Sequence, residues 1–520
     1  MEASKGMKIR LNQCLLTIYL VFITISSVYL YVTRNKLKLC IIIAGLVIGY
    51  YIVSGLIIKG INLIASAKGA NHGTRGCVGV FAVSTAITLM IFMTCFAAAY
   101  PGTFETDCIT QLKQTVSGVY DDWHPIWHTL VCFTLPYKLT GQAASIVVFQ
   151  ILYLSAAIGF MTMVIYKGAG LTACIISYLY IVLNPFTLYI SVSPLKDVGF
   201  GAACLVAMTL AADMYFDRDT VKPAVWKCIL LGFMMANASI FRHNGLLFSV
   251  FLIFALFFHI IRSRWIVTAC VFALSYFVIQ GPVCSLVHAQ HSETAVIQVV
   301  GLPMCIIGNT AVDTPDLMDE ETEEFVYSIA PKEVWEDRFV RGNFNRMKYG
   351  GLHNPDAIEE KGVLPIVKMA LRCAAASPQA SLESFFALTD FVYGFDVRNK
   401  ADIDVIVLGE ADNDLGITYQ GNDTIAHIME LYHKTAMVKG YNFILKLGFS
   451  VLIVISVILA VCRLNSWTDW KRIFSAFPIL AYDFGTMLLL SGHDARFFFM
   501  SFLICPLTVI MLLDNRENMV

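Results

Sequence analysis

The sequence predicts an all-α integral membrane protein with about twelve transmembrane helices and a mostly helical segment outside the membrane. Hydrophobic residues make up 57% of the chain and charged residues 14%, whereas soluble domains carry roughly 25% charged residues. Apolar runs of about the 20 residues that cross a bilayer recur along the chain. The acidic residues, by contrast, gather in one long polar segment. These three observations define the fold class and are taken in order below.

The apolar runs indicate where the chain crosses the membrane. They lie near residues 12–32, 39–58, 77–98, 142–165, 170–190, 197–215, 226–241, 246–261, 265–285, 441–461, 474–491 and 497–513. The run from Ile126 to Leu139 is too short to cross, and Pro136 and Lys138 interrupt its end, so we expect a helix along the membrane surface. The first run lacks a small-residue cleavage motif and another follows at once, which predicts a retained anchor.

The same runs divide the chain into three parts. We expect a transmembrane domain over residues 1–285, with its first extracytoplasmic loop at 99–141, and C-terminal transmembrane helices over 441–520. Residues 286–440 hold 24 of the 38 acids and 12 of the 37 bases, and we interpret them as an extracytoplasmic, acidic helical domain. Within it, Thr314-Pro315 and Ser377-Pro378 each predict the start of a helix.

The basic residues indicate the orientation. Lys and Arg near span ends mark the cytoplasmic side. When the N-terminus is inside, one side of the membrane receives a large set of basic residues, and the group from Arg34 to Lys38 is the exception. The set is Lys5, Lys8, Arg10, Lys59, Lys68, Arg75, Lys167, Arg218, Lys222, Lys227, Arg262, Arg264, Arg463, Lys471 and Arg472. We therefore expect a multi-pass protein of the plasma membrane with both termini in the cytoplasm.

The 15 cysteines do not predict a disulfide framework or a zinc site. They fall mostly in apolar runs, where a thiol behaves as a small hydrophobe, and there is no C-x-x-C pair. Cys305 and Cys373 share the large polar segment, and a disulfide between them is left open.

The stretch from Tyr100 to Pro125 places ionisable side chains directly beside apolar runs, where they are costly to hold unless wetted or paired. Its acids and histidine are Glu105, Asp107, Asp121, Asp122 and His124. Asp107 lies just beyond a span and is our candidate catalytic base, which would take a proton from an acceptor hydroxyl. General-base assistance of this kind contributes about 10² to 10⁴ in rate. The alternative is that Asp107 caps a helix carrying Gln111 and Gln114.

A second polar cluster reads Asp121-Asp122-Trp123-His124-Pro125. Asp122 and His124 are suited to orienting a sugar or a divalent cation, and an indole face can stack on a pyranose ring. The alternative is a polar turn before a helix that begins at Pro125, with Trp123 as an interfacial aromatic residue. Without a third ligand of known geometry, the sequence does not predict a metal.

Three short turns carry charge at the same predicted side of the membrane. They contain Lys196 and Asp197, Arg242 and Asn244, and Asp494 and Arg496. We expect the three cations to converge on a phosphate, which Arg binds with a two-pronged fork and Lys as a point charge. The alternative is that these cations extend to lipid headgroups.

These motifs resemble a known family. Asp107 within T-F-E-T-D-C-I-T-Q, the following D-W-H-P, the turns S-P-L-K-D and F-R-H-N-G-L, and the closing H-D-A-R-F-F are similar to the GT-C superfamily of membrane glycosyltransferases, which includes protein O-mannosyltransferases and aminoarabinose transferases. The resemblance covers nearly the whole chain as architecture and short motifs. It implies an inverting transferase that uses a polyprenyl-phosphate sugar, with Asp107 as the base. Many members carry Asp-Glu or Asp-x-Asp in this loop. The present sequence departs from that pattern, because Asp107 is followed by Cys108 and Ile109.

We therefore predict an enzyme that moves a sugar from a polyprenyl-phosphate carrier to a hydroxyl of a glycan, lipid or protein at the outer face of the membrane. The expected substrate contacts are Asp122, His124, Lys196, Asp197, Arg242, Asn244, Asp494 and Arg496. A divalent cation is left open as a cofactor. Beyond the donor and acceptor we expect membrane lipids as partners and no nucleic acid.

Two other classes of protein fit parts of the sequence. About twelve spans suit a transporter or lipid flippase, which usually shows paired repeats and charged groups near mid-membrane. In this sequence most candidate groups lie near one surface and no repeat is visible, although Asp483 lies within a predicted span. A membrane O-acyltransferase would use His124 or His128, but these histidines lie in an outside loop.

Overall fold

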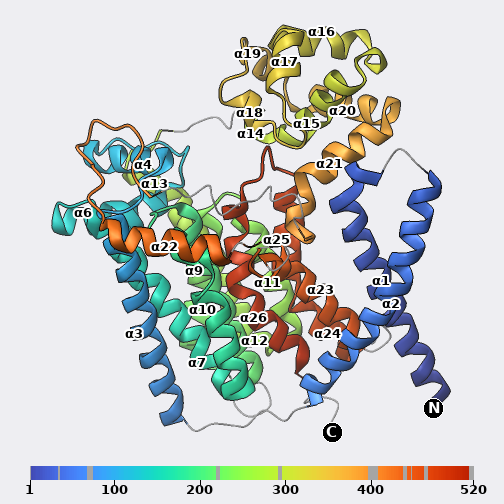
Figure 1. Ribbon diagram of the computed structural model, residues 1–520. Coiled ribbons are helices and arrows are strands. Elements are labelled where there is room, and N and C mark those ends of the chain that lie inside the picture. The colour runs from blue at the N-terminus through green and yellow to red at the C-terminus, as the bar shows by residue number, and fades with distance from the viewer. Residues whose placement is uncertain are drawn as a thin grey trace.

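The computed structural model shows an all-helical protein, as the sequence predicts, built from a bundle of long helices and a separate lobe at one end of it (Figure 1). The structure describes residues 2–32, 36–66, 74–217, 223–290, 296–395, 408–436, 438, 442–446, 448–461 and 467–514. Arg34, part of the exceptional basic group, lies outside these residues. Within them the only β-pairing is three isolated bridges.

Most predicted spans correspond to long apolar helices. Six helices in the described residues are long and apolar enough to cross a membrane, and they lie at Leu39–Ile64, Gly76–Ala99, Ala144–Val182, Lys196–Phe216, Arg262–Leu286 and Ala495–Leu513. Shorter apolar helices cover Leu11–Ser27, Val225–Phe241, Gly245–His259 and Phe449–Val461. The chain is therefore a multi-pass membrane protein.

The helices of the bundle are α1 (Glu2–Val32), α2 (Lys36–Ser66), α3 (Thr74–Ala99), α7 (Ala144–Val182), α9 (Lys196–Phe216), α10 (Val225–Phe241), α11 (Gly245–His259), α12 (Arg262–Val278), α23 (Phe449–Val461), α24 (Trp467–Phe474), α25 (Phe477–Met487) and α26 (Phe499–Leu513). Helix α9 is buried along nearly its whole length and packs against α7, α10 and α26. The centre of the bundle is therefore a helix whose first residue is Lys196.

Two predicted spans, 142–165 and 170–190, are joined in one long element, α7, that turns back on itself. Gly170 has φ 86° and ψ −178°, which breaks the helix and suits glycine because it has no Cβ. Before the turn, Tyr166 lies against Gly76 near the start of α3. After it, the Tyr178 hydroxyl lies 3.0 Å from that of Thr88, further along α3. The two halves of α7 therefore run in opposite directions along α3.

The segment predicted to lie along the membrane surface stays at one end of the bundle. It forms α5 (Ile126–His128), a π-helix (Thr129–Thr134) and α6 (Leu135–Thr140). The π-helix packs against α4 (Thr106–Ser117), and Figure 1 shows α4 and α6 together at that end.

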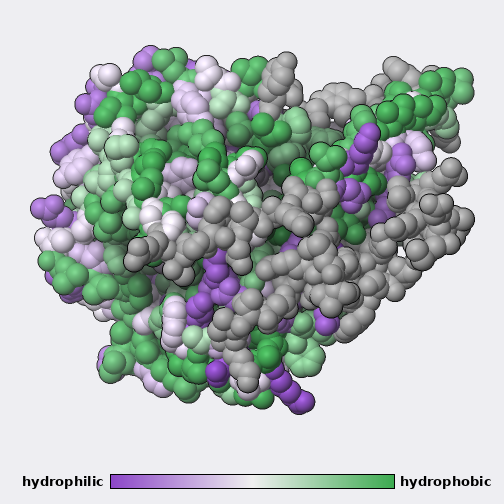
Figure 2. Space-filling model, turned by 90° about the horizontal axis from the view of Figure 1, so that it is seen from below, coloured by the Kyte–Doolittle hydropathy of each residue, from purple (hydrophilic) through white to green (hydrophobic). Residues whose placement is uncertain are grey.

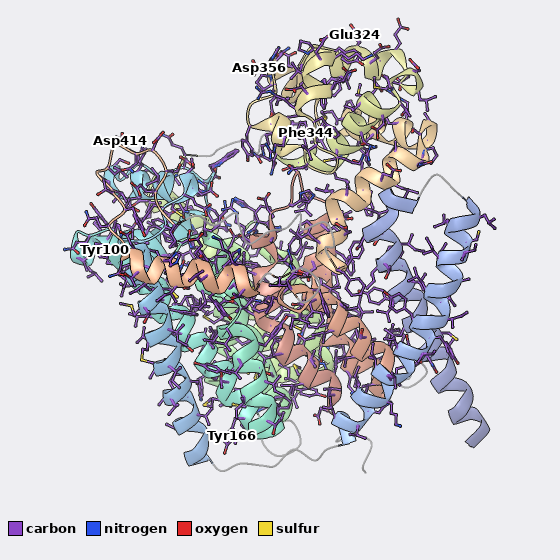
Figure 3. All side chains as sticks on the ribbon, in the orientation of Figure 1. Tyr100, Tyr166, Glu324, Phe344, Asp356 and Asp414 are labelled. Atoms are coloured by element: carbon purple, nitrogen blue, oxygen red, sulfur yellow. The ribbon has the colours of Figure 1, made fainter. Side chains whose placement is uncertain are left out.

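We call the end of the bundle nearest the lobe the lobe end and the opposite end the far end. At the lobe end α3 finishes near Tyr100, whereas Tyr166 lies at the far end (Figure 3). The start of α1 and the end of α26 also lie at the far end (Figure 1). Seen from there, hydrophilic groups form patches between hydrophobic ones (Figure 2).

The lobe consists of α14 (Val296–Val299), α15 (Gly301–Asp313), α16 (Glu320–Ile329), α17 (Lys332–Arg338), α18 (Asn345–Lys348), α19 (Asp356–Lys361), α20 (Val363–Ala376) and α21 (Pro378–Tyr393). Trp335 and Phe344 are fully buried in its core. The helix predicted at Ser377-Pro378 is present as α21. Thr314-Pro315 instead opens a single 3₁₀ turn, and Asp319 caps α16 by accepting from the Thr322 N–H.

Cys305 and Cys373, the pair left open as a disulfide, are both buried and are not joined by a disulfide. They lie on α15 and α20 of the lobe, two helices that pack against each other.

Residues 408–422, which we call the strap, lie across the loop that leads into α4. The Phe104 N–H donates to the Gly409 carbonyl at 3.0 Å, and the Ala411 N–H donates to the Phe104 carbonyl at 2.8 Å. Lys113 of α4 pairs with Asp414 at 2.8 Å. After the strap, α22 (Asp423–Ala436) packs against α3, so the end of the 286–440 segment lies on the bundle and not within the lobe.

Candidate active site

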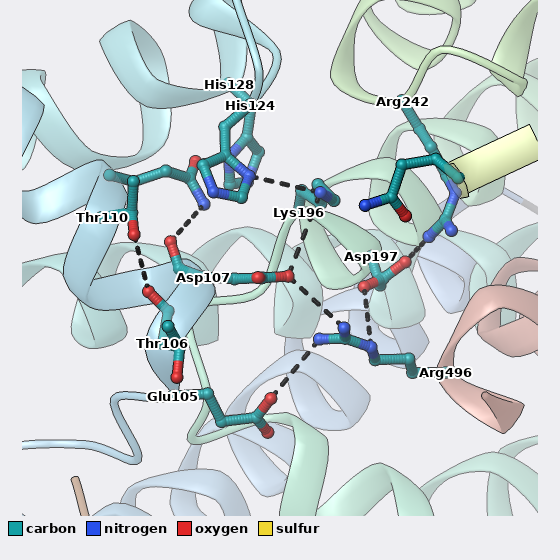
Figure 4. A network of polar contacts seen from close by, with 12 residues as sticks. Glu105, Thr106, Asp107, Thr110, His124, His128, Lys196, Asp197, Arg242 and Arg496 are labelled. Carbon is teal, nitrogen blue, oxygen red and sulfur yellow. Dashed lines mark hydrogen bonds and ion pairs between the residues drawn. The ribbon is translucent and has the colours of Figure 1, made fainter. Parts of the chain in front are cut away.

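Side chains from four distant parts of the chain meet at the lobe end of the bundle (Figure 4). Glu105 and Asp107 come from the start of α4, and Lys196 and Asp197 from the start of α9. Arg242 follows α10, and Arg496 precedes α26. We call these six residues the lobe-end network. It holds three carboxylates and three cations.

Asp107 occupies the first turn of α4 and faces two cations. Its Oδ2 lies 3.3 Å from Arg496 Nη2 and 4.0 Å from Lys196 Nζ. The helix cap position belongs to Glu105, so the structure does not support the alternative that Asp107 serves as the helix cap. Burial acts to raise the pKa of Asp107, but Lys196 and Arg496 outweigh it and hold the pKa below its usual value. Asp107 is therefore ionised at neutral pH, and its side chain is 31% exposed.

Arg496 is the hub of the network. Its guanidinium lies 3.4 Å from Glu105, 3.3 Å from Asp107 and 3.9 Å from Asp197. A planar guanidinium offers five N–H donors in a fixed fork, which explains how one side chain meets three carboxylates.

Lys196 lies between an acid and a histidine. Its Nζ lies 3.3 Å from Nδ1 of His124. Burial and the Lys196 charge lower the pKa of His124 to about 4. The imidazole is thus neutral at pH 7 and accepts a hydrogen bond from the ammonium group through Nδ1. His124, predicted as a substrate contact, therefore also orients Lys196.

Asp197 and Arg242 form an ion pair behind the exposed groups. The Asp197 side chain is 1% exposed and that of Arg242 8%. Arg242 Nε also donates to Asn244 Oδ1 at 3.1 Å, and Asn244 donates to Thr486 Oγ1 at 3.0 Å. The Arg242 guanidinium lies 3.9 Å from the centre of the Phe497 ring. This arrangement fixes the turn that carries Arg496.

Two predicted substrate residues lie beside the network. Asp494 Oδ2 accepts from the Asn345 side chain of the lobe at 3.4 Å. The Asp122 N–H donates to the Gln290 carbonyl at 3.0 Å, and the Asp122 carboxylate acts on the charge of His243. The structure thus brings His124, Lys196 and Arg496 up to Asp107 and leaves these two acids at the edge.

Glu105, Gln111 and His128 are named from the sequence, but the sequence does not predict that they support Asp107. Glu105 shares Arg496, as described above. Gln111, one turn after Asp107, donates weakly to the Asp107 carbonyl at 3.4 Å and lies 2.8 Å from Nδ1 of His128. The spacing of four residues on a predicted helix was the available signal.

His128 is buried against Phe133 and Phe241, with ring centroids at 5.8 and 5.3 Å. Burial lowers the pKa of His128 to about 3, so the imidazole is neutral at pH 7. Its Nδ1 partner is Gln111, which makes His128 part of the packing that holds α4 in place.

The described residues contain no group of three or more His, Cys, Asp and Glu side chains placed to hold a metal ion. The carboxylates of the lobe-end network face cations instead.

The fold and these spans define the class: a multi-pass α-helical membrane protein with a charged site at the lobe end. No protein-family model and no curated protein matches the sequence. Among solved structures, the chain is similar to the crystal structure of ArnT from Cupriavidus metallidurans bound to undecaprenyl phosphate. The match covers 84% of this chain and 78% of that chain at 12% identity, with a TM-score of 0.30. At that score the match supports no statement about the chemistry of this chain.

Proposed function

We propose that the protein is an inverting glycosyltransferase that moves a hexosyl or pentosyl group from a polyprenyl-phosphate carrier to a hydroxyl acceptor. The observation that carries the proposal is the meeting of one partly exposed carboxylate, Asp107, with Lys196 and Arg496 from two other elements. The motif resemblance to the GT-C superfamily supports the same conclusion.

The reaction needs both kinds of charge. The acceptor hydroxyl gives its proton to the Asp107 carboxylate while its oxygen forms a bond to the anomeric carbon of the sugar. On the opposite face, the bond between that carbon and the phosphate oxygen breaks, and the electron pair leaves with the polyprenyl phosphate. The leaving group gains one negative charge, so cations stabilise it more as the reaction proceeds.

Lys196 and Arg496 are the proposed phosphate ligands because their side chains are 19% and 23% exposed. Arg242 is more deeply placed and bound to Asp197. We assign Arg242, Asp197 and Asn244 to positioning Arg496. His124 orients Lys196, and Asp122 and Asp494 are proposed to contact the substrates from the edge.

The charge balance suggests how the base is activated. Three cations face three carboxylates, so an incoming phosphate must take over part of the hydrogen bonding now given to the acids. When Arg496 and Lys196 turn to the phosphate, Asp107 loses the two influences that lower its pKa. Asp107 then becomes a stronger base, because basicity rises with pKa. Binding of the polyprenyl-phosphate sugar would thus come first and would make Asp107 better able to accept the proton of the acceptor hydroxyl.

The rival classes receive less support from the geometry. The lobe-end network lies at one end of the spans, whereas transporters place substrate and ion sites near mid-membrane. His128 is enclosed by aromatic rings, which does not suit an acyl-transfer histidine that must meet a thioester. We further propose that the lobe end faces the outside of the plasma membrane, with both termini in the cytoplasm and membrane lipids around the bundle.

The test uses purified protein, labelled undecaprenyl-phosphate sugars and acceptor membranes from cells that lack the protein. Asp107→Asn keeps the shape of the side chain but removes the base, and should reduce transfer by about 10² to 10⁴. The matched control is Asp414→Asn on the strap, where the carboxylate is 76% exposed, and this variant should keep its activity. Undiminished transfer by Asp107→Asn would refute the assignment.

A further inference from the structure

One segment of the acidic lobe is basic. Residues 338–349 contain four of the 12 bases of the 286–440 segment and none of its 24 acids. The four bases are Arg338, Arg341, Arg346 and Lys348. Figure 3 shows Glu324 and Asp356 on the side of the lobe away from the bundle, and Phe344, within the basic segment, on the side nearer to it. The basic segment thus includes Phe344 on the side of the lobe nearer to the bundle.

Contacts of α18 fix this segment to the turn that precedes Arg496. The Asn345 N–H donates to the Ser491 carbonyl at 3.1 Å, and the Ser491 hydroxyl donates to Asn345 Oδ1 at 2.7 Å. Asn345 Nδ2 donates to Asp494 at 3.4 Å. His493 contacts the Ala387 carbonyl of α21 at 2.9 Å. Two elements of the lobe therefore hold the turn of the lobe-end network.

Lys348 and Tyr349 follow Asn345 by three and four residues. Side chains at these spacings share one face of a helix, so both lie on the side of α18 that meets the Asp494 turn. Lys348 is hydrogen-bonded to Gln298, and its ammonium lies 5.1 Å from the centre of the Tyr349 ring. The Tyr349 side chain is 73% exposed, although aromatic residues usually bury most of their surface.

The electrostatics agree with this placement. The surrounding protein raises the pKa of the Tyr349 phenol, and the charges of Asp494 and Asp107 raise it further. Asp107 and Tyr349 are therefore close enough to influence each other, although they are 242 positions apart in the chain. The exposed Tyr349 ring thus directly follows a helix that is hydrogen-bonded to Asp494, two residues before Arg496 of the lobe-end network.

We propose that Tyr349 and Lys348 form the acceptor subsite of the enzyme and bind an acidic saccharide. The exposed ring offers a flat apolar face for the C–H face of a sugar ring. The ammonium group beside it offers a partner for a carboxylate on that sugar. A saccharide held there lies next to Asp107, where its hydroxyl can lose a proton. This inference rests on the proposed glycosyl transfer and names its acceptor class.

The test measures binding of two small probes to the full-length protein in lipid nanodiscs by saturation-transfer difference NMR. The probes are methyl glucoside and methyl glucuronoside, which share one ring and differ by a carboxylate. The wild-type protein should bind both and favour the glucuronoside. Tyr349→Ala should weaken both signals by about tenfold, since loss of a stacked ring costs on the order of 1 kcal/mol or more. Tyr349→Phe should keep both.

Lys348→Met should remove the preference for the glucuronoside and leave the glucoside unchanged. Lys332→Met is its matched control, because Lys332 is an exposed lysine on α17 of the lobe, and it should behave as wild type. Equal signals for wild type and Tyr349→Ala, or equal binding of the two probes by wild type, would overturn the acceptor subsite.

A parallel titration with undecaprenyl phosphate separates failure of this inference from failure of the proposed function. If the lipid phosphate binds and Tyr349 proves irrelevant to the sugars, the subsite is wrong and the transferase proposal stands. If the sugars bind through Tyr349 while Asp107→Asn transfers normally, the catalytic assignment is wrong and the saccharide site stands. Retained lipid-phosphate binding by Tyr349→Ala also shows that the variant is folded.

Discussion

Two clusters of ion pairs occupy opposite ends of the bundle and differ in how completely their charges are paired. At the far end, Lys167 lies 2.7 Å from Asp213 and 2.6 Å from Asp217, and Lys227 lies 2.5 Å from Asp213. At the lobe end, Asp107 lies 3.3 Å from Arg496 and 4.0 Å from Lys196. Both clusters use residues from distant helices.

Exposure does not explain the contrast. Lys167 and Asp217 at the far end are each 27% exposed, close to the 31% of Asp107. The difference lies in the geometry around Asp107: Lys167 and Lys227 meet Asp213 at 2.7 and 2.5 Å, whereas Arg496 and Lys196 meet Asp107 at 3.3 and 4.0 Å. Tight pairing is suited to holding α7, α9 and α10 together. Loose pairing leaves hydrogen-bonding capacity that a phosphate and a hydroxyl can use.

The largest expected effect tests the lobe-end side of this comparison. Arg496→Met should lower the affinity for undecaprenyl phosphate by about 10- to 100-fold, because hydrogen bonds to a charged group contribute roughly 1.5 to 3 kcal/mol. Arg496→Lys should restore part of the charge but not the fork. Calorimetric titration in nanodiscs measures both. Lys227→Met at the far end is the control, and a similar loss of affinity there would contradict the division of roles.

The next effect tests the far-end side. Asp213 is 8% exposed and pairs with Lys167 and Lys227, so Asp213→Asn leaves both lysines with Asp217 alone, which lies 2.6 Å from Lys167 and 3.9 Å from Lys227. Breaking a buried ion pair costs about 3 kcal/mol or more, and for a chain of this length we expect Tm to fall by about 3 °C. The affinity for undecaprenyl phosphate should remain that of wild type. An unchanged Tm would show that the far-end cluster is not a structural clamp.

A smaller effect should appear in the pH dependence of transfer. Because Lys196 and Arg496 hold the pKa of Asp107 below its usual value, the acid limb of kcat/KM should lie at lower pH than that of an unperturbed aspartate. Lys196→Met removes one of the charges that lower this pKa, so the limb should move to higher pH. A profile that extends below the ordinary aspartate pKa of about 3.9 checks the shift. Identical profiles for wild type and Lys196→Met would show that Lys196 does not influence the pKa of Asp107.

The smallest effect concerns Glu105. Burial raises the pKa of Glu105 despite Arg496, so the folded state binds a proton more readily than the unfolded state. Its stabilising contribution is complete at low pH and is lost as pH rises through the folded-state pKa. Glu105→Gln should therefore raise Tm near neutral pH and leave it unchanged near pH 4. Thermal unfolding at both pH values measures this, and a lower Tm at neutral pH would show that the pairing with Arg496 dominates.

The helices of the bundle could be predicted from the sequence, because each long apolar run corresponds to a stretch that can cross the membrane. Counting those runs also placed Asp107, Lys196 and Arg496 on one side of the membrane, and the structure brings the three together. Span parity works here because each residue lies within a few positions of a span end.

Other features depend on contacts that no local pattern encodes. The reversal at Gly170 was visible in the sequence, because Lys167, Gly168 and Gly170 separate the predicted spans 142–165 and 170–190. The sequence did not show that the two halves would form one continuous element. The bonds of Asn345 to Ser491 and Asp494 join positions about 150 residues apart. From the sequence, Arg242 was a reasonable candidate for a phosphate ligand. Only the structure shows that Asp197 and Phe497 enclose its guanidinium.

The residues that hold Asp107 in place are synthesised long after Asp107 itself, because they belong to the strap and to the turn before α26. Phe104 is hydrogen-bonded to residues 409 and 411, and Asp107 receives its guanidinium from residue 496. A ribosome adds residues one by one from the N-terminus, so the catalytic loop is made long before either of its supports. We therefore expect the surroundings of Asp107 to be complete only after the strap and Arg496 have been synthesised.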